Sequence, residues 1–232
     1  MALAFDVATF NSGAGDRSFT HTPSGTPRAV AVVIAAADNT LGGQAVNDTV
    51  DGVTYGGVAL TRVLRAVDPS TTEGGSAYLY FLGESVPTGA RTVVVDDDAT
   101  MANVTYGVWV LTFTAASDVA VAATKITEGD VANPSATIPT LAGYSGIVVA
   151  GLYSGINDPD EIAIGAGYTR LAGSQATGQD FGVMSAVCVH GAKSGANVVA
   201  DFTALSNDVA LVAAALAESS AQTPPYANVT IS

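Results

Sequence analysis

The sequence predicts an all-β protein of the sandwich or barrel type, and two observations support this prediction. Val, Thr, Gly and Ala dominate the chain, and apolar strand-like runs recur at short spacing between clusters of Gly, Pro, Asn, Asp and Ser. The second observation is an internal repeat, in which segments of the first half have counterparts in the second half. We therefore expect helix to be a minor component.

Three similarities between the halves are specific enough to name. Thr61-Arg62-Val63 matches Thr169-Arg170-Leu171, and Thr88-Gly89-Ala90 matches Ser194-Gly195-Ala196 in a turn. The apolar strand after each of these turns ends in polar residues that include an aspartate. The offsets, about 105 to 117 residues, vary only as loop lengths would allow. The repeat predicts a duplicated β-unit of roughly six strands per half.

The expected strands follow this repeat along the chain, after an opening strand that ends near Asn11. In the first half they are residues 18–22, 29–37, 53–63, 76–82, 90–96 and 103–113. In the second half they are residues 135–140, 146–154, 163–173, 181–191, 197–203 and 208–218. Gly56-Gly57 suits a bend or bulge within its segment, and long loops are expected at residues 38–51, 68–75 and 157–161.

A single domain is expected over residues 1–218, because β proteins of this length are often one domain. The pseudo-repeats would cover residues 18–115 and 135–218, with the symmetry broken near residues 115–135. The alanine-rich tract 210–218 is assigned as a strand, because it takes the place of residues 103–113 in the repeat. Alanine is a strong helix former and a poor strand former, so a helix is the alternative there.

The charge of the chain excludes several classes of partner. A formal net charge of −13 with eight Lys and Arg residues argues against nucleic-acid binding, which needs clustered cations, and against an anionic membrane surface. The amino terminus carries Asp6 within its apolar stretch and has no basic region, so it does not resemble a secretory signal. The chain is therefore expected to be soluble and made in the cytoplasm. The single cysteine, Cys188, is expected to be a small core residue.

The candidate catalytic and metal-binding residues are few. His21 and His190 are the two histidines, neither belongs to a nucleophile motif, and both are expected to be structural or surface residues. No enzyme activity and no cofactor are therefore predicted. Two acidic clusters raise a calcium hypothesis, residues 96–98 and the group Asn157, Asp158, Asp160 and Glu161. Neither cluster matches the spacing of the EF-hand calcium loop, and a solvated strand end and a solvated turn are the simpler interpretation.

Carbohydrate binding would need exposed aromatic side chains with polar neighbours. The candidates are Tyr78, Tyr80, Phe81, Tyr106 and Trp109. Tyr78 and Tyr80 share one face of a strand, and Trp109 falls on the opposite face from Tyr106. One of the two faces must be the core, so the sequence does not establish a sugar platform.

The carboxyl-terminal segment, residues 219–232, is expected to form an arm outside the core. Its Pro224-Pro225 pair redirects the chain before the strand-like sequence YANVTIS. Arms of this kind add a strand to a neighbouring subunit, whereas the simpler interpretation is a frayed end. The candidate partner-binding residues are Pro224, Pro225, Tyr226, Val229 and Ile231.

The stretch VDGVTYGGVALTRV, followed by SAYLYFL and then PTGARTVVV, resembles a β-sandwich module of phage virion proteins that is also seen in some bacterial surface proteins. The resemblance covers about residues 18–115 directly and the second half through the internal repeat. It implies a jelly-roll-like antiparallel β-sandwich with a structural or adhesive role. The motif is typical of a fold rather than of a site, so no catalytic residue is transferred.

Within this resemblance, the expected function is that of a capsid decoration (cement) protein. Such a protein would be located in the virion and would contact the major capsid protein or other virion proteins, as a homo-oligomer such as a trimer. Two alternatives stay open. One is a tail or head fibre component that binds host surface glycans, and the other is a bacterial carbohydrate-binding module.

Overall fold

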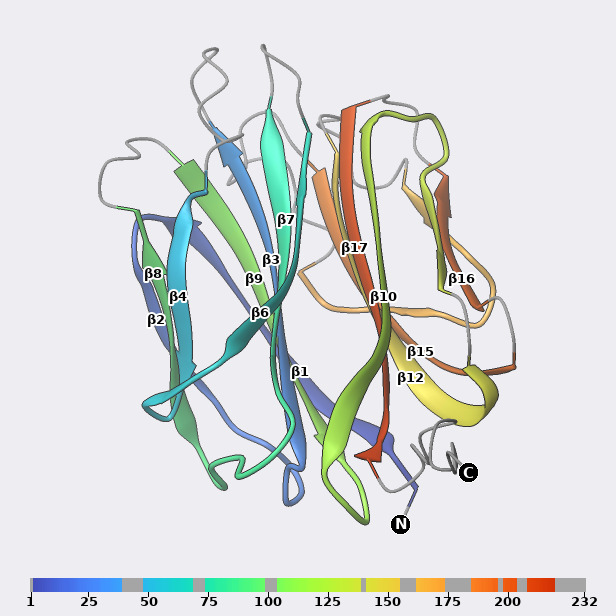
Figure 1. Ribbon diagram of the computed structural model, residues 1–232. Helices are drawn as coiled ribbons and strands as arrows, with labels where there is room; N and C mark the ends of the chain where they lie inside the picture. The colour runs from blue at the N-terminus through green and yellow to red at the C-terminus, as the bar shows by residue number, and fades with distance from the viewer. Residues whose placement is uncertain are drawn as a thin grey trace, which may run out of the picture.

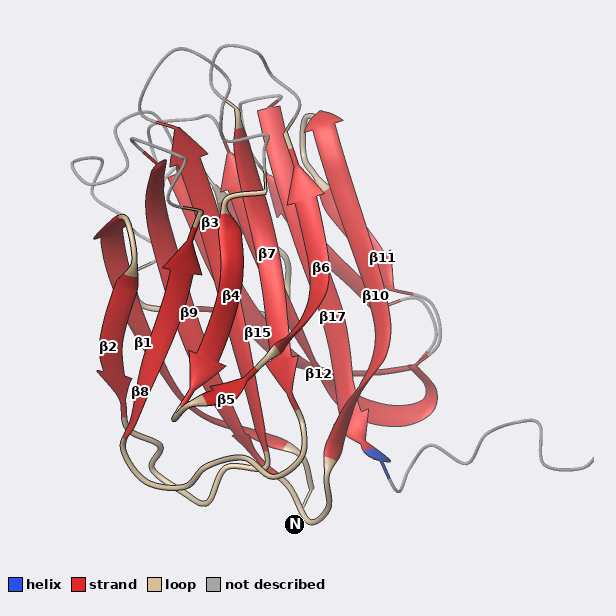
Figure 2. Ribbon diagram, turned by 60° about the vertical axis from the view of Figure 1, so that its left-hand side comes forward, coloured by secondary structure: helices blue, strands red, loops and turns tan. Residues whose placement is uncertain are grey.

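The computed structural model arranges the chain as four antiparallel sheets stacked face to face (Figures 1 and 2). It describes residues 2–38, 48–68, 74–98, 104–138, 141–154, 162–173, 185–195, 198–203 and 208–219. The strands are β1 (Ala4–Ala14), β2 (Arg17–His21), β3 (Ala29–Asp38), β4 (Val50–Tyr55), β5 (Val58–Ala59), β6 (Thr61–Val67), β7 (Gly75–Leu82), β8 (Arg91–Asp97), β9 (Val104–Thr114), β10 (Val119–Asp130), β11 (Ser135–Ile138), β12 (Leu141–Ser154), β13 (Ala163–Ile164), β14 (Thr169–Arg170), β15 (Ser185–Gly195), β16 (Val198–Thr203) and β17 (Asp208–Glu218).

The two halves of the chain have the same strand order. In each half, we call the sheet that faces the other half the inner sheet and the remaining sheet the outer sheet. In the first half, the inner sheet has the order β1-β9-β3-β7-β6 and the outer sheet has the order β2-β8-β4-β5. In the second half, the inner sheet is β10-β17-β12-β15-β14 and the outer sheet is β11-β16-β13. Each strand of the second half therefore takes the place of a first-half strand whose number along the chain is eight or nine lower; β10 corresponds to β1, for example, and β17 to β9. The predicted all-β sandwich is confirmed, and the jelly-roll assignment stays a prediction with which these orders are compatible.

The equivalence extends beyond the predicted repeats. β1 and β10, which lie outside residues 18–115 and 135–218, take the same edge position in their inner sheets. Both strands also carry a register shift near their start, between Phe5 and Val7 in β1 and between Val121 and Ala123 in β10. Each half consequently holds more strands than the roughly six predicted. The predicted strand 53–63 divides into β4, β5 and β6, and the predicted strand 163–173 contains β13 and β14. The region 115–135, where a break in the symmetry was expected, instead holds β10, the counterpart of β1.

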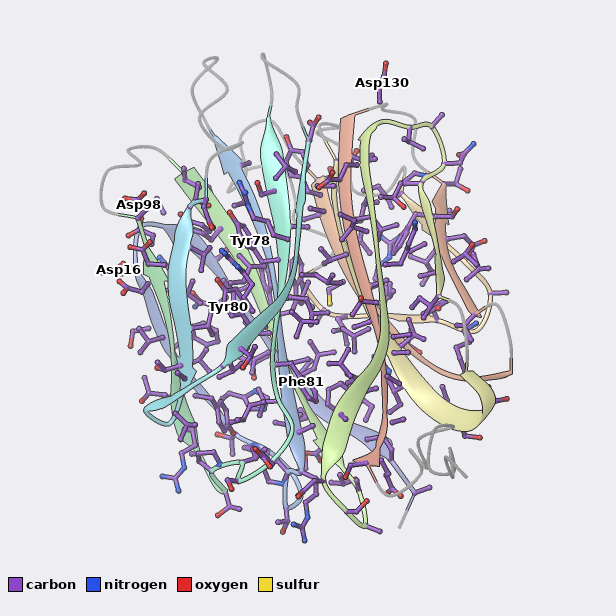
Figure 3. The ribbon with its side chains drawn as sticks, viewed as in Figure 1. Asp16, Tyr78, Tyr80, Phe81, Asp98 and Asp130 are labelled. Atoms are coloured by element: carbon purple, nitrogen blue, oxygen red, sulfur yellow. The ribbon has the colours of Figure 1, made fainter. Side chains whose placement is uncertain are left out.

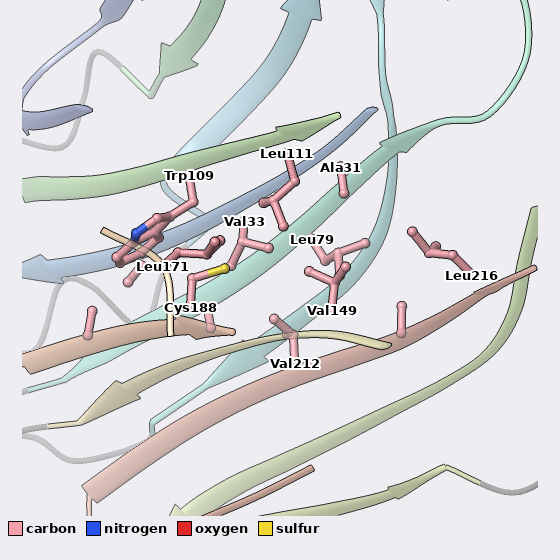
Figure 4. Close-up of a cluster of buried hydrophobic side chains, with 14 of the residues drawn as sticks. Ala31, Val33, Leu79, Trp109, Leu111, Val149, Leu171, Cys188, Val212 and Leu216 are labelled. Carbon is pink, nitrogen blue, oxygen red and sulfur yellow. The ribbon is translucent and has the colours of Figure 1, made fainter. Parts of the chain in front are cut away.

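The inner sheets of the two halves pack against each other through an apolar layer that we call the junction (Figure 4). Small side chains allow this close approach. A Cβ added to Gly151 of β12 would lie 2.2 Å from Val33 Cγ1 of β3, and one added to Gly75 would lie 2.2 Å from the Tyr153 ring. Cys188 of β15 is fully buried in this layer, as predicted, and burial raises the pKa of its thiol.

Successive residues of the inner strands alternate between the junction and the cores of the two halves. In β17, Val212 and Leu216 face the junction, whereas Val209 and Leu211 face the second outer sheet. The alanine-rich tract is thus a strand, as predicted, and the helical alternative is wrong. Its neighbours explain the outcome, because β17 lies between β10 and β12 with both faces buried, a setting that overrides the intrinsic preference of alanine.

Glycines shape two of the predicted turns. Gly56 and Gly57 form the two-residue turn between β4 and β5, with φ values of 58° and 81°. Positive φ at both central residues is what a two-residue type I′ hairpin turn requires. Gly89 and Gly195, which the repeat aligns, both have positive φ, at 74° and 101°.

The opening strand, β1, is longer than expected, because it continues through Gly13 to Ala14 instead of turning after Asn11. No helix among the described residues is long and apolar enough to cross a bilayer.

Candidate functional site

His21 is the centre of a buried polar network in the first half. Its Nδ1 lies 2.8 Å from Thr9 Oγ1, and its Nε2 lies 3.2 Å from Thr112 Oγ1. Thr112 Oγ1 donates in turn to Asp6 Oδ2 at 3.1 Å. Burial lowers the pKa of His21 to about 4, with the Asp6 charge acting in the opposite direction, so the ring is neutral at pH 7.

This network has a structural arrangement rather than that of a catalytic triad. The hydroxyl of Thr112 stands between the carboxylate and the imidazole, so Asp6 does not orient the ring directly. Asp6 Oδ2 also accepts hydrogen bonds from the backbone N–H groups of Ser24, at 3.0 Å, and Gly25, at 3.3 Å. The network therefore ties β1, β2 and β9 to the loop that precedes β3. In the second half, the register equivalents of Asp6 and Thr112 are Ala122 and Ala215.

His190 lies apart from His21, in β15 of the second half. Its ring stacks on Phe5 of β1, with centroids 3.9 Å apart and an interplanar angle of 17°. Burial lowers its pKa. The contact joins the inner sheets of the two halves, so of the two roles that the sequence left open for His190, structural or surface, the structure shows a packing role.

The predicted aromatic candidates are packing residues. Tyr78, Tyr80 and Tyr106 are buried between the sheets of the first half, and Trp109 is buried on the opposite face, in the junction. Phe81 is half-buried, and Figure 3 shows it nearer to the second half than Tyr78 and Tyr80. The shared face of Tyr78 and Tyr80 and the opposite face of Trp109 are as predicted. The four buried rings, Tyr78, Tyr80, Tyr106 and Trp109, are not available as a sugar platform.

The three tyrosines instead fix the chain that enters β4. Tyr78 Oη accepts a hydrogen bond from the Thr49 backbone N–H at 3.0 Å, and Tyr106 Oη donates to the Thr49 carbonyl at 2.8 Å. Tyr80 Oη donates to the Val50 carbonyl at 3.3 Å, and burial raises the pKa of Tyr80 to about 12. These bonds anchor the first residues of the strand to the inner sheet.

Carboxylates gather at one end of the molecule, which we call the acidic end. Asp16 lies in the turn between β1 and β2, Asp96 to Asp98 lie at the end of β8, and Asp130 ends β10. Figure 3 shows Asp16 and Asp98 close together at this end of the first half and Asp130 at the same end of the second half. Among the described residues, no group of three or more acidic, histidine or cysteine side chains is arranged to hold a metal ion.

Asp16 and Asp97 form a carboxylate pair within the acidic end. Asp16 Oδ1 accepts a hydrogen bond from the Asp97 backbone N–H at 3.0 Å. Partial burial, a hydrogen bond to Asp16 and the charge of Asp16 raise the pKa of Asp97 to about 6, whereas the hydrogen bonds from Asp97 lower the pKa of Asp16. The sequence suggested the 96–98 cluster but not its fourth member. The other calcium candidates, Asn157, Asp158, Asp160 and Glu161, lie outside the described residues.

A groove of about 430 Å³ lies between the β4–β5 hairpin and β6, and we call it the hairpin groove. Asp48 and Arg62 form an ion pair at its edge, with Arg62 Nη1 2.7 Å from Asp48 Oδ1 and 2.5 Å from Oδ2. The two side chains are 44% and 41% exposed, and their hydrogen bond raises the pKa of Arg62. Asp51, Leu60 and Tyr80 also line the groove, so carboxylates, a guanidinium and apolar surface meet there.

A second groove, of about 480 Å³, lies where the two halves meet, and we call it the junction groove. Its apolar lining comes from Val63 of β6, Phe81 and Leu82 of β7, and Val119 and Val121 of β10; Thr61, Gly83, Glu84, Asp118, Ala120 and Ser219 complete it. The Val119 backbone N–H donates to the Gly83 carbonyl at 3.0 Å, which joins the two halves beside the groove.

The predicted partner-binding residues, Pro224, Pro225, Tyr226, Val229 and Ile231, lie outside the described residues. The last described residue, Ser219, lines the junction groove. Its backbone N–H donates to the Asp118 carbonyl at 2.8 Å. Ser219, where the predicted arm begins, therefore lies at this groove. Comparisons of the chain with protein-family models, with curated proteins and with solved structures found no match.

Proposed function

We propose that the protein is a structural component of a phage particle, a decoration (cement) protein that bridges subunits of the capsid. The proposal rests on the resemblance of residues 18–115 to a virion sandwich module and on one structural observation. That observation is the fusion of two β-sandwiches into a single four-layer block through the junction. In this proposal the partner is the major capsid protein or another virion protein.

Several contacts make the block suitable for bearing load. The junction is joined by the Val119 to Gly83 hydrogen bond and by a bond from the Val67 backbone N–H to Glu128 Oε1, at 2.8 Å. Trp109 Nε1 of the first half also donates to the Ala172 carbonyl of the second, at 3.0 Å. A rigid block that contacts several shell subunits would stabilise the lattice by repeating modest contacts many times.

The test is to count this chain in purified virus particles from its source, by quantitative mass spectrometry. A copy number that matches the number of lattice positions on the shell is expected. A reconstitution experiment tests the mechanism. The protein should cosediment with shells that lack it and should raise the temperature at which those shells rupture. A chain that is absent from particles, or that leaves shell rupture unchanged at saturation, would overturn the proposal.

A fibre component that binds host glycans is the second candidate, and the hairpin groove favours it. The groove offers hydrogen-bond acceptors on Asp48 and Asp51, donors on Arg62, and apolar surface from Leu60, a combination that suits a neutral polyhydroxylated ligand. A glycan array should then show saturable binding that Arg62→Gln abolishes and that Arg28→Gln, an exposed arginine outside the groove, leaves unchanged. A bacterial carbohydrate-binding module would give the same array result without any copies in particles.

A further inference from the structure

The junction groove lies between the edge strands of the two inner sheets. β6 is the last strand of the first inner sheet, and β10 is the edge strand of the second. Each has a register shift beside the groove, between Arg62 and Leu64 in β6 and between Val121 and Ala123 in β10. An edge strand presents backbone N–H and C=O groups on its outer side, and these can accept an added strand.

The lining of the groove is apolar and partly exposed to solvent. Val63, Phe81, Leu82 and Val121 are each half-buried, so part of their apolar surface still faces water in a single chain. Covering that surface with apolar side chains would be favourable. A segment that entered the groove would therefore combine backbone pairing with hydrophobic contact.

The carboxyl-terminal sequence YANVTIS, residues 226–232, has the pattern that such a groove requires. Ala227, Val229 and Ile231 fall on one face of an extended strand, and Tyr226, Asn228 and Thr230 fall on the other. Residues 220–232 contain no charged side chain, whereas the chain as a whole has a net charge of −13. Glu84 and Asp118 border the groove, and they would repel a segment that carried carboxylate side chains.

We propose that the junction groove binds the carboxyl-terminal arm of a second copy of this chain, with residues 226–232 added as a β-strand. The predicted arm begins at Ser219, which lines the groove of its own chain. Binding its own groove would require the chain to reverse within residues 220–225. Thr223 and Pro224 each precede a proline, which biases their backbone toward an extended conformation, so the sequence leaves residues 220–222 and Pro225 for the reversal. Exchange between two copies needs no reversal.

The proposal concerns contacts between copies of the chain and stands whether or not the protein decorates a shell. Its test uses the full chain and measures molar mass by light scattering. The unaltered chain is expected at a multiple of its 23.1 kDa mass. Val121→Glu, which places a charge in the groove, and the double substitution Val229→Glu with Ile231→Glu, which places charges on the arm, should both reduce the mass to that of one chain.

Matched controls separate this result from a general effect of added charge. Val58 and Val199 are each 38% exposed and lie outside the groove, so Val58→Glu and Val199→Glu should leave the molar mass unchanged. Circular dichroism checks that every variant is folded. Mixing the groove variant with the arm variant should restore a two-chain species, since one has an intact arm and the other an intact groove.

Three outcomes would overturn the proposal. The first is a single-chain mass for the unaltered protein over the whole range of concentrations measured. The second is an oligomer that persists in both the groove and the arm variants. The third is a monomer whose melting temperature falls equally in the groove and arm variants, which would place the arm in the groove of its own chain.

Discussion

At the scale of single residues, the polar side chains of the first half act mainly on the fold. His21 is fully buried and contacts threonine hydroxyls on β1 and β9, from positions 12 and 91 residues away in the sequence. Three tyrosine hydroxyls contact the backbone at the start of β4. Buried polar groups need such partners, because leaving one unsatisfied costs about 1–3 kcal/mol.

The pKa of His21 predicts how stability depends on pH. The folded pKa, about 4, lies below the ordinary value of 6.5, so the unfolded chain binds a proton first as pH falls. The contribution of His21 is complete above pH 6.5 and is lost as pH falls toward 4. The loss should be about 1.4 kcal/mol per pH unit and roughly 3 kcal/mol in total. Urea unfolding at several pH values measures it.

The control for this prediction is His21→Gln, which has no titrating group at this position. This variant should lose the part of the pH dependence that lies between pH 6.5 and 4, whereas His190→Gln should keep most of it. Identical pH slopes for the unaltered chain and His21→Gln would show that the imidazole does not titrate as its burial indicates.

The carboxylate pair at the acidic end should titrate in the opposite sense. The pKa of Asp97 is raised from 3.8 to about 6, so its protonated form is favoured in the fold and its contribution to stability is lost as pH rises through 6. Asp16→Asn removes the hydrogen-bonding carboxylate and should lower the pKa of Asp97 toward its ordinary value. Carboxyl NMR titration measures this shift. Asp96→Asn, which removes a charge without that hydrogen bond, should lower the pKa less, and an equal effect would contradict the pairing.

At the scale of elements, close approach between strands of different halves depends on missing side chains. Gly151 of β12 faces Val33 of β3, and a methyl group at position 151 would overlap with Val33 Cγ1. Alanine-rich β17 packs in the same layer. Small residues in these strands let the inner sheets approach closely, which explains why a sequence with weak strand preference forms central strands.

Gly151→Ala should therefore destabilise the protein by about 1–3 kcal/mol, the usual cost of overpacking a core. Adding Val33→Ala should recover part of that loss, because it removes the atoms that clash. The control is Gly52→Ala, where an added Cβ meets nothing within 4 Å. Chemical unfolding of the single and double variants forms a double-mutant cycle. Strictly additive effects of the two substitutions would rule out the contact.

At the scale of the whole molecule, the junction makes the two halves dependent on each other. Leu79, Leu111 and Phe113 of the first half are buried by the second half's inner sheet. A separated half would expose this apolar face, and large exposed apolar faces drive association. The equivalent strand orders describe a duplication, but the shared layer indicates one cooperative unit.

Trp109, the single tryptophan, provides a direct test of this cooperativity. It is buried in the junction and bonded to the Ala172 carbonyl, so its fluorescence reports on contact between the halves. Thermal unfolding followed by Trp109 fluorescence should coincide with unfolding followed by far-ultraviolet circular dichroism. A fluorescence transition that precedes the loss of strand signal would show that the halves separate before they unfold.

The sequence by itself determined the all-β class, most of the strands, the repeat and the glycine turns, because these depend on local pattern, but it missed β10 and the division of residues 53–63 into β4, β5 and β6. Continuous apolar runs predicted β3 and β8, Gly56-Gly57 predicted the bend, and the repeat assigned residues 208–218 as a strand against the helix preference of alanine. Each of these inferences used residues that are neighbours in the chain or aligned by the repeat.

Only the tertiary structure decided which residues meet across strands and layers. The contact of His21 with Thr112, the pairing of Asp16 with Asp97, the packing of Gly151 on Val33 and the two grooves all join distant segments. Their geometry depends on strand register and on which sheet faces which. A register shift of one residue would turn every side chain to the opposite face, and composition and spacing do not specify that choice.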